Sequence, residues 1–219
     1  MVIVFDETRV LSGPVSRRYN ICLYWGREHH LSLREEDGST IIFIDRYYGV
    51  GGNSSLLWDK TITIKITAVK DKVSIRIKME PIDETVDKEE YVPGMRMGWI
   101  DILVNFWKTN GVELDDAYYR EHYPLDHIKT RFERRYNMII ILILFNTINI
   151  VLASYFLSYP GFFIGFFLCL YSFFGELLMN FRFINTTKLS KKLYPNAVPI
   201  SPWKMKLVST FDNIVTFDP

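Results

Sequence analysis

Four neighbouring residues, Glu121, His122, Asp126 and His127, carry the carboxylate and imidazole groups that bind metals or move protons. The two histidines are five residues apart, a spacing that does not place them on one helix face, and Pro124 interrupts the backbone between them. Zinc needs ligands that converge at about 2 Å. We therefore treat these residues as a polar cluster, and we predict no metal, no cofactor and no catalytic residue. An enzyme acting on a membrane-borne substrate is the least favoured interpretation.

A second set of polar residues lies in an apolar stretch. From Tyr136 to Phe181 the one side chain charged at neutral pH is Glu176. Seven residues of this stretch recur at spacings of three and four, which place them on one face of each of two predicted helices. A turn of the chain at 158–161 would bring the two faces together. Small and hydrogen-bonding residues hold helices together in lipid, so we predict a hairpin seam there. Its members are Asn146, Asn149, Ala153, Gly165, Cys169, Ser172 and Glu176.

Glu176 itself has two interpretations. A carboxylate inside a membrane is a candidate functional group that binds a proton or a basic partner. The alternative, which we favour, is that the side chain reaches the headgroups close to Arg182.

The elements that would position the seam are two apolar runs, 138–157 and 161–180, each as long as the roughly 20 residues that cross a bilayer. We therefore predict a two-helix transmembrane hairpin over 138–181. Basic residues flank it on both sides and predict an integral membrane protein with both termini in the cytoplasm. These membrane-surface residues are Lys129, Arg131, Arg134, Arg135, Arg182, Lys188, Lys191 and Lys192. Residues 182–219 form the predicted basic cytoplasmic tail.

Residues 113–137 are predicted to form an amphipathic linker helix. Pro124 suits a first helical turn, and Leu125, Ile128 and Phe132 recur at spacings of three and four. This apolar stripe has two interpretations, either lying at the lipid headgroups or packing on protein.

Residues 1–112 are predicted to form a cytoplasmic α+β domain, an antiparallel β-sheet with one packing helix. Alternation of apolar and polar residues over 61–79 predicts a β-hairpin, and Asp37-Gly38 predicts a second one with a type I′ turn. Residues 1–5 and 20–25 are further candidate strands. A helix is predicted over 95–109, where Asn110-Gly111 would end it.

Charge and composition limit the function. The chain has 26 Lys and Arg against 25 Asp and Glu, without the basic stripe of a nucleic-acid-binding protein. We predict a membrane-anchored accessory or interaction protein that presents its sheet domain at the membrane surface, in contact with lipids and with a protein partner, as a subunit of a larger complex. The alternative is a membrane-anchored protein that binds or senses a lipid-like or other small ligand inside the sheet domain. The sequence does not indicate the oligomeric state.

Overall fold

The computed structural model describes residues 5–45, 60–82, 93–141, 143–148, 151, 155, 184–197, 200–216 and 218, without the side chains of 93–97, 214 and 215. The chain divides into two compact units, Met1–Asp115 and Asp116–Pro219. We call them the N-terminal unit and the C-terminal unit. The predicted boundary of the sheet domain, at residue 112, lies three residues before this division.

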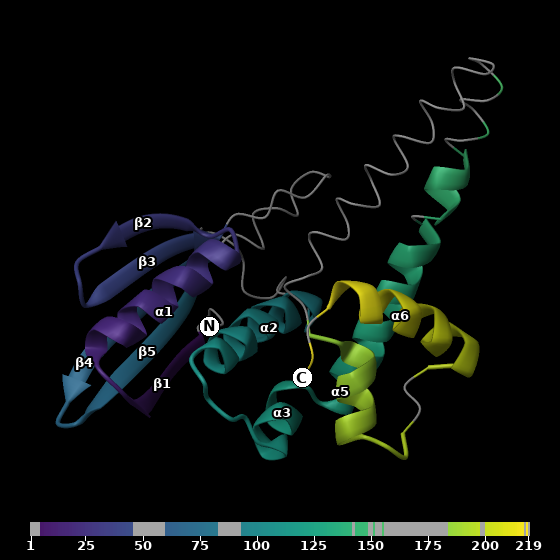
Figure 1. Cartoon of the computed structure of the whole chain (residues 1–219). Coiled ribbons are helices and arrows are strands. Elements are labelled where there is room, and N and C mark those ends of the chain that lie inside the picture. Colours follow the sequence, from purple (N-terminus) through teal and green to yellow (C-terminus); the bar gives the residue numbers. More distant parts are fainter. Residues whose placement is uncertain are drawn as a thin grey trace. The chain divides into compact units, whose positions relative to one another are not determined.

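The N-terminal unit is an α+β domain built on a five-stranded antiparallel sheet (Figure 1). The strands follow the spatial order β1-β5-β4-β3-β2, so β1 and β2 are the edges and α1 connects one edge to the other. In chain order the elements are β1 (Phe5–Ser12), α1 (Val15–Glu28), β2 (Ser32–Glu36), β3 (Thr40–Asp45), β4 (Lys60–Val69), β5 (Lys72–Pro81) and α2 (Pro93–Thr109).

Both predicted hairpins are present. β4 pairs with β5 and β2 pairs with β3, each antiparallel. The turn between β2 and β3 differs from the predicted type I′, which needs two successive residues with positive φ. Of its residues only Gly38 has a positive φ, and the Asp37 carboxylate instead accepts hydrogen bonds from the backbone N–H groups of Ser39 (2.9 Å) and Thr40 (2.6 Å). These bonds lower the pKa of Asp37, because they stabilise its charged form.

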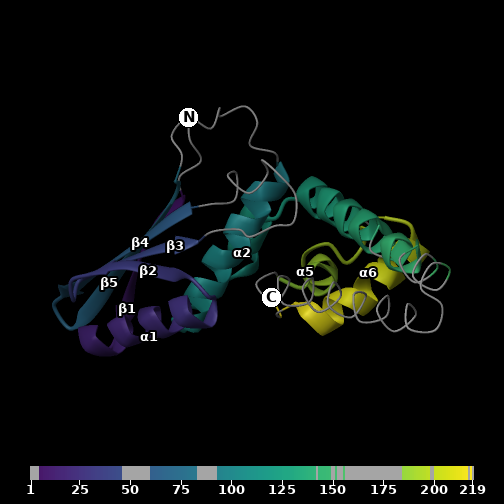
Figure 2. The same ribbon diagram turned by 90° about the horizontal axis from the view of Figure 1, so that it is seen from above.

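The prediction of a strand over 20–25 is wrong, because these residues belong to α1. Cys22, Trp25 and Gly26 are its buried residues, at the spacing of three and four that marks one face of a helix. The sheet therefore carries two packing helices where one was predicted. The predicted helix over 95–109 corresponds to α2, and Gly111, just after its end, has φ +73°. Figure 2 shows α1 and α2 on the same side of the sheet.

The core of the N-terminal unit lies between this face of the sheet and the two helices. Trp25 of α1 packs edge-on against Phe106 of α2 (ring centroids 4.9 Å apart) and against Phe43 of β3 (6.3 Å). Isoleucines of β4 and β5 form the floor, with side chains that are almost completely buried. Aromatic rings thus occupy the space between sheet and helices.

α1 approaches the sheet closely at Gly26. A Cβ atom added there would lie 2.2 Å from Cζ of Phe43, a distance that real side chains do not adopt. We expect Gly26→Ala to lower the free energy of unfolding by about 1–3 kcal/mol through overpacking, despite the higher helix propensity of alanine. Urea unfolding measures this loss. In a Phe43→Leu background the same substitution should cost less, and an equal cost in both backgrounds would contradict the steric explanation.

The C-terminal unit is helical in its described residues. It contains α3 (Asp116–His122), helical residues at 125–141, 143–148, 151 and 155, then α5 (Thr186–Leu193) and α6 (Pro202–Val215). We call the helical residues from 125 onward the long-helix segment. Ile128 and Phe132 are fully buried, which decides between the two interpretations of the predicted amphipathic stripe in favour of packing on protein. Part of the predicted basic tail is folded as α5 and α6.

The structure contradicts the predicted transmembrane hairpin over 138–181. In the described ranges no helix is both long enough and apolar enough to cross a bilayer. Within the first predicted span the described residues are 138–141, 143–148, 151 and 155, and all of them are helical. Ile139 of that span is 3% exposed and continues the stripe that packs on protein. The second predicted span, 161–180, lies outside the described residues. The predictions of a membrane-spanning hairpin and of an integral membrane location therefore fail on this finding.

Candidate functional site

Two residues of the predicted polar cluster, His122 and Asp126, make contacts with nearby residues of the chain. Nδ1 of His122 lies 3.0 Å from the carbonyl oxygen of Tyr118, and the two rings stack with centroids 4.2 Å apart. Glu121 and Asp126 are exposed, and His127 is half-buried. Across the described part of the chain, no three His, Cys, Asp or Glu side chains are grouped so that they could hold a metal ion.

The predicted membrane-surface residues occupy different environments. Arg131 and Arg135 are buried, and Nη2 of Arg131 donates to the carbonyl oxygen of Ile184 (3.4 Å). These two guanidinium groups are therefore used inside the C-terminal unit. Lys129 is half-buried, while the exposed members of the set are Arg134, Lys188, Lys191 and Lys192. Arg182 lies outside the described residues.

Of the predicted hairpin seam, only Asn146 is described, and it is half-buried. The other members, Asn149, Ala153, Gly165, Cys169, Ser172 and Glu176, lie outside the described residues, so the seam stays a prediction.

In the described part of the C-terminal unit, several polar groups surround Asp212 of α6, which is fully buried. Its carboxylate pairs with Arg135 and accepts hydrogen bonds from both the backbone N–H and the hydroxyl of Thr187, each at 3.2 Å. Thr187 lies in the first turn of α5, and Asn185 caps that helix by accepting a hydrogen bond from the backbone N–H of Lys188 at 2.9 Å. A buried carboxylate at the N-terminus of α5 neutralises the guanidinium and satisfies amide groups that the helix leaves unpaired. The arrangement joins α5, α6 and the long-helix segment, a structural role that sequence reasoning missed.

A second buried charge pair lies in the N-terminal unit. Nζ of Lys60 is 2.8 Å from Oδ2 of Asp45, and both side chains are about 95% buried. Nζ also lies 5.3 Å from the ring centroid of Trp99 on α2. Lys60 precedes the core residues Ile62 and Ile64 of β4 at intervals of two residues, so it lies on the same face of the strand. This alternation could have predicted from the sequence that the lysine points inward.

Polar atoms also join α1 to α2. Oδ1 of Asn105 accepts from Nε1 of Trp25 (3.0 Å) and lies 2.6 Å from Nε2 of His29. Because that oxygen has no proton to donate, His29 must donate from Nε2. Burial raises the pKa of Cys22 to about 12, so this thiol is protonated at neutral pH and is no nucleophile. The contacts of Asn105 with Trp25 and His29 stabilise the pair of helices α1 and α2.

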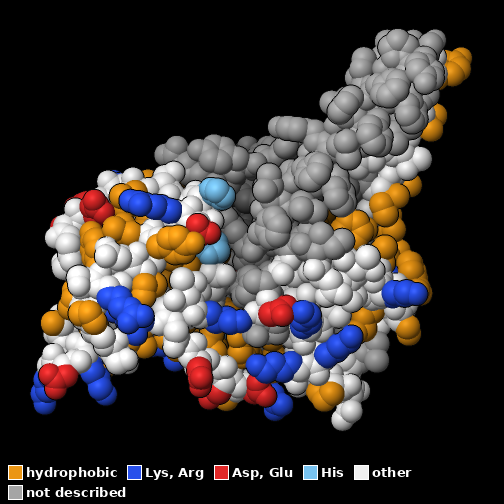
Figure 3. Space-filling model, in the orientation of Figure 1, with side chains coloured by type: hydrophobic (Ala, Val, Ile, Leu, Met, Phe, Trp, Pro, Cys, Tyr) orange, Lys and Arg blue, Asp and Glu red, His pale blue; other side chains and the backbone are white. Residues whose placement is uncertain are grey.

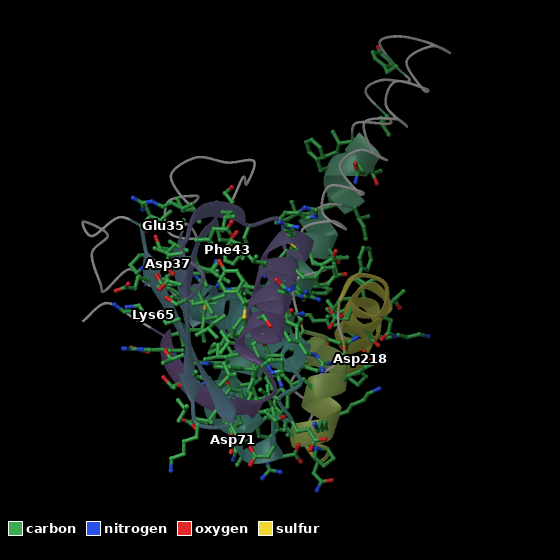
Figure 4. The ribbon with its side chains drawn as sticks, turned by 60° about the vertical axis from the view of Figure 1, so that its left-hand side comes forward. Glu35, Asp37, Phe43, Lys65, Asp71 and Asp218 are labelled. Carbon is green, nitrogen blue, oxygen red and sulfur yellow. The ribbon has the colours of Figure 1, made fainter. Side chains whose placement is uncertain are left out.

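The remaining candidate is the face of the sheet opposite α1 and α2, which we call the open sheet face. In the described part of the N-terminal unit, both helices lie on the other side. Figure 4 shows Phe43 directed toward α1 and Lys65 directed away from it. The strand registers align the side chains of this face in cross-strand rows. Its central members are Asp6, Thr8, Ile42, Thr61, Thr63, Lys65, Thr67, Lys72, Ser74, Arg76, Lys78 and Glu80.

Ion pairs order part of the open sheet face. The guanidinium of Arg76 donates to both carboxylate oxygens of Asp6, from Nε at 2.7 Å and from Nη2. This two-point hydrogen bond lowers the pKa of Asp6. Nζ of Lys78 pairs with Glu80 at 2.5 Å. Lys65 and Lys72 form no ion pair with any residue that the structure describes, so their ammonium groups remain available to a binding partner.

Comparisons of the chain with protein-family models, with curated proteins and with solved structures find no match.

Proposed function

We propose that this protein is a non-enzymatic accessory protein whose N-terminal unit binds a partner protein through the open sheet face. One observation supports the proposal. The open sheet face carries both the ordered Asp6–Arg76 pair and the two available ammonium groups of Lys65 and Lys72. Ordered side chains lose little conformational freedom on binding, which favours recognition by a rigid surface.

The chemistry of the face defines the partner. Threonine and serine hydroxyl groups donate and accept hydrogen bonds, and Ile42 and Ile44 add half-buried apolar surface. Protein–protein interfaces are as a whole about as polar as the rest of the surface, so the polarity of this face is compatible with the proposal. The partner should present carboxylates opposite Lys65 and Lys72, since opposed charges across an interface guide association and register.

The alternative of a lipid-like or small ligand inside the sheet domain stays a prediction. The ring contacts of Trp25 with Phe43 and Phe106 fill that region, so the interior offers no observation in its favour.

A photo-crosslinking amino acid tests the proposed surface. We expect the label at Thr67, exposed on the open sheet face, to capture one stoichiometric partner from the source cells. The same label at Asn20, exposed on α1, should capture none. Equal capture from both positions would contradict the assignment of the face.

Charge reversal of the two available lysines then measures their contribution to binding. We expect Lys65→Glu with Lys72→Glu to raise the Kd for the captured partner about tenfold, a change of about 1.4 kcal/mol. The matched control is Arg17→Glu with Arg27→Glu, which changes the net charge equally at exposed positions of α1. If both double variants weaken binding equally, net charge rather than the open sheet face is responsible.

A further inference from the structure

Two aromatic rings of the C-terminal unit meet at a right angle. Tyr136 belongs to the long-helix segment and Trp203 to the first turn of α6, which lies beside that segment (Figure 1). The ring centroids are 5.2 Å apart, and the ring planes are inclined at 86°. We call this pair the aromatic corner. Trp203 is 59% exposed and Tyr136 is half-buried, so a solute can reach the corner from water. Figure 3 shows hydrophobic and basic side chains side by side on this unit, at the right of the view.

The aromatic corner holds a cation that the chain itself supplies. Nζ of Lys204 lies 4.7 Å from the ring centroid of Tyr136 and 5.9 Å from that of Trp203. Both distances are within the roughly 6 Å at which the face of a ring attracts a cation. Among the residues that the structure describes, no carboxylate pairs with this ammonium group. The two rings therefore already act as a cation site.

A quaternary ammonium group should compete with Lys204 for this position. The ammonium of lysine is compact and strongly hydrated, whereas a trimethylammonium group has no N–H donors and gives up less water when it contacts a ring. Aromatic rings that meet around a cation are the usual means by which proteins recognise such groups. Lys204 is half-buried, and its long side chain can carry the displaced ammonium back into water.

The charged residues beside the aromatic corner indicate what else the ligand carries. Lys206 is exposed and lies three residues after Trp203, on the same face of α6. With the displaced Lys204 it offers positive charge for an anion next to the corner. Glu133, three residues before Tyr136, adds a carboxylate on the other helix. A ligand that joins a quaternary ammonium to a phosphate complements both signs, whereas a methylated lysine side chain carries no anion for the two lysines.

We propose that the aromatic corner binds a phosphocholine group, with its trimethylammonium between the two rings and its phosphate on the lysines of α6. Both a soluble ligand and a lipid headgroup can present this chemistry. The inference does not use the open sheet face.

Titration of the full chain with phosphocholine tests the site, and the methyl signal of the ligand in NMR spectra gives the Kd. We expect saturable binding that Trp203→Ala abolishes and that Trp203→Phe, which keeps a ring, retains in part. The matched control is Tyr24→Ala, which removes a 60% exposed ring from α1 and should leave the Kd unchanged. A neutral analogue, with a tert-butyl group in place of the trimethylammonium, should bind at least about tenfold more weakly because the rings attract charge. Absence of saturable binding, or equal affinity for the neutral analogue, would overturn the proposal.

Lys204→Met tests the two roles given to this lysine. Choline has the ammonium but no phosphate, so loss of the competing lysine should raise its affinity about fivefold. Phosphocholine loses a phosphate contact in the same variant, so its preference over choline should fall. An unchanged affinity for choline would contradict the displacement of Lys204 and overturn the proposed site.

Vesicles identify the source of the phosphocholine group. Flotation with phosphatidylcholine but not with phosphatidylglycerol, lost in Trp203→Ala, assigns the site to a lipid headgroup. Binding of soluble phosphocholine without flotation assigns it to a soluble ligand. Flotation with phosphatidylglycerol alone, together with no binding of soluble phosphocholine, would show a general basic surface and refute the site.

Discussion

Replacing Asp212 with alanine is expected to destabilise the C-terminal unit by about 3–5 kcal/mol, because the substitution removes one partner of a buried ion pair. The guanidinium of Arg135, which is about 91% buried, then loses the carboxylate that offsets its desolvation. The backbone N–H and hydroxyl of Thr187 lose their acceptor in the same step. Urea unfolding followed by circular dichroism measures the loss. Hydrogen exchange at the first amides of α5 should report it locally.

A matched substitution separates this effect from a general one. Asp218 also pairs with a basic residue of α5, Lys188, at 2.7 Å, but both side chains are largely exposed. Asp218→Ala should therefore cost far less, since solvent and salt screen exposed pairs. Removing both buried charges, as in Arg135→Met with Asp212→Leu, should recover part of the stability. A loss at Asp212 no larger than that at Asp218 would refute the importance of the buried pair.

Lys60→Met should destabilise the N-terminal unit by about 3–5 kcal/mol. Methionine retains most of the side-chain volume but leaves the buried carboxylate of Asp45 without the lysine charge 2.8 Å away. It also removes the cation from its position over the ring of Trp99. Thermal and urea unfolding, monitored by tryptophan fluorescence, give the size of the change.

The same strand provides the control. Lys65→Met makes an identical substitution on β4, but on the exposed open sheet face, and should change stability by no more than about 0.5 kcal/mol. In the double variant Lys60→Met with Asp45→Leu, both charges are gone and the loss should shrink. If the double variant is less stable than Lys60→Met alone, Asp45 stabilises the fold independently of Lys60.

Local sequence patterns determined the β-hairpins and α2. Alternation over 61–79 gives each strand one apolar and one polar face, and this pattern lies within the sequence of the strand itself. Asp37-Gly38 and Asn110-Gly111 mark chain reversals and helix ends because glycine adopts a positive φ without steric cost. These signals need no information about distant residues, so the positions of the turn and of the helix end could be read from the sequence, whereas the type I′ turn predicted at Asp37-Gly38 was wrong.

The pattern of residues 20–25 was ambiguous. A short segment with apolar residues fits both the two-residue period of a strand and the 3.6-residue period of a helix. In the structure, Cys22, Trp25 and Gly26 form the buried face of a helix, and Trp25 packs against Phe43 and Phe106. Tertiary packing therefore decided between two elements that the local pattern allowed equally.

The apolar stretch after Tyr136 led to the transmembrane prediction for a related reason. Hydropathy measures how apolar a run of residues is, but it does not show what covers the run, and Ile139, inside the predicted span, is buried. Arg135 illustrates the limit, since its position before an apolar run suggested a membrane surface. Its partner, Asp212, lies 77 residues away in the chain.

The sequence alone therefore determined the α+β class, the antiparallel hairpins and the positions of apolar stripes, because each depends on residues within a few positions of one another. Only the tertiary structure decided which stripes are buried, which charges pair inside the units and which sheet face α1 and α2 leave uncovered. Those properties depend on contacts between residues far apart in the chain, and no local spacing encodes them.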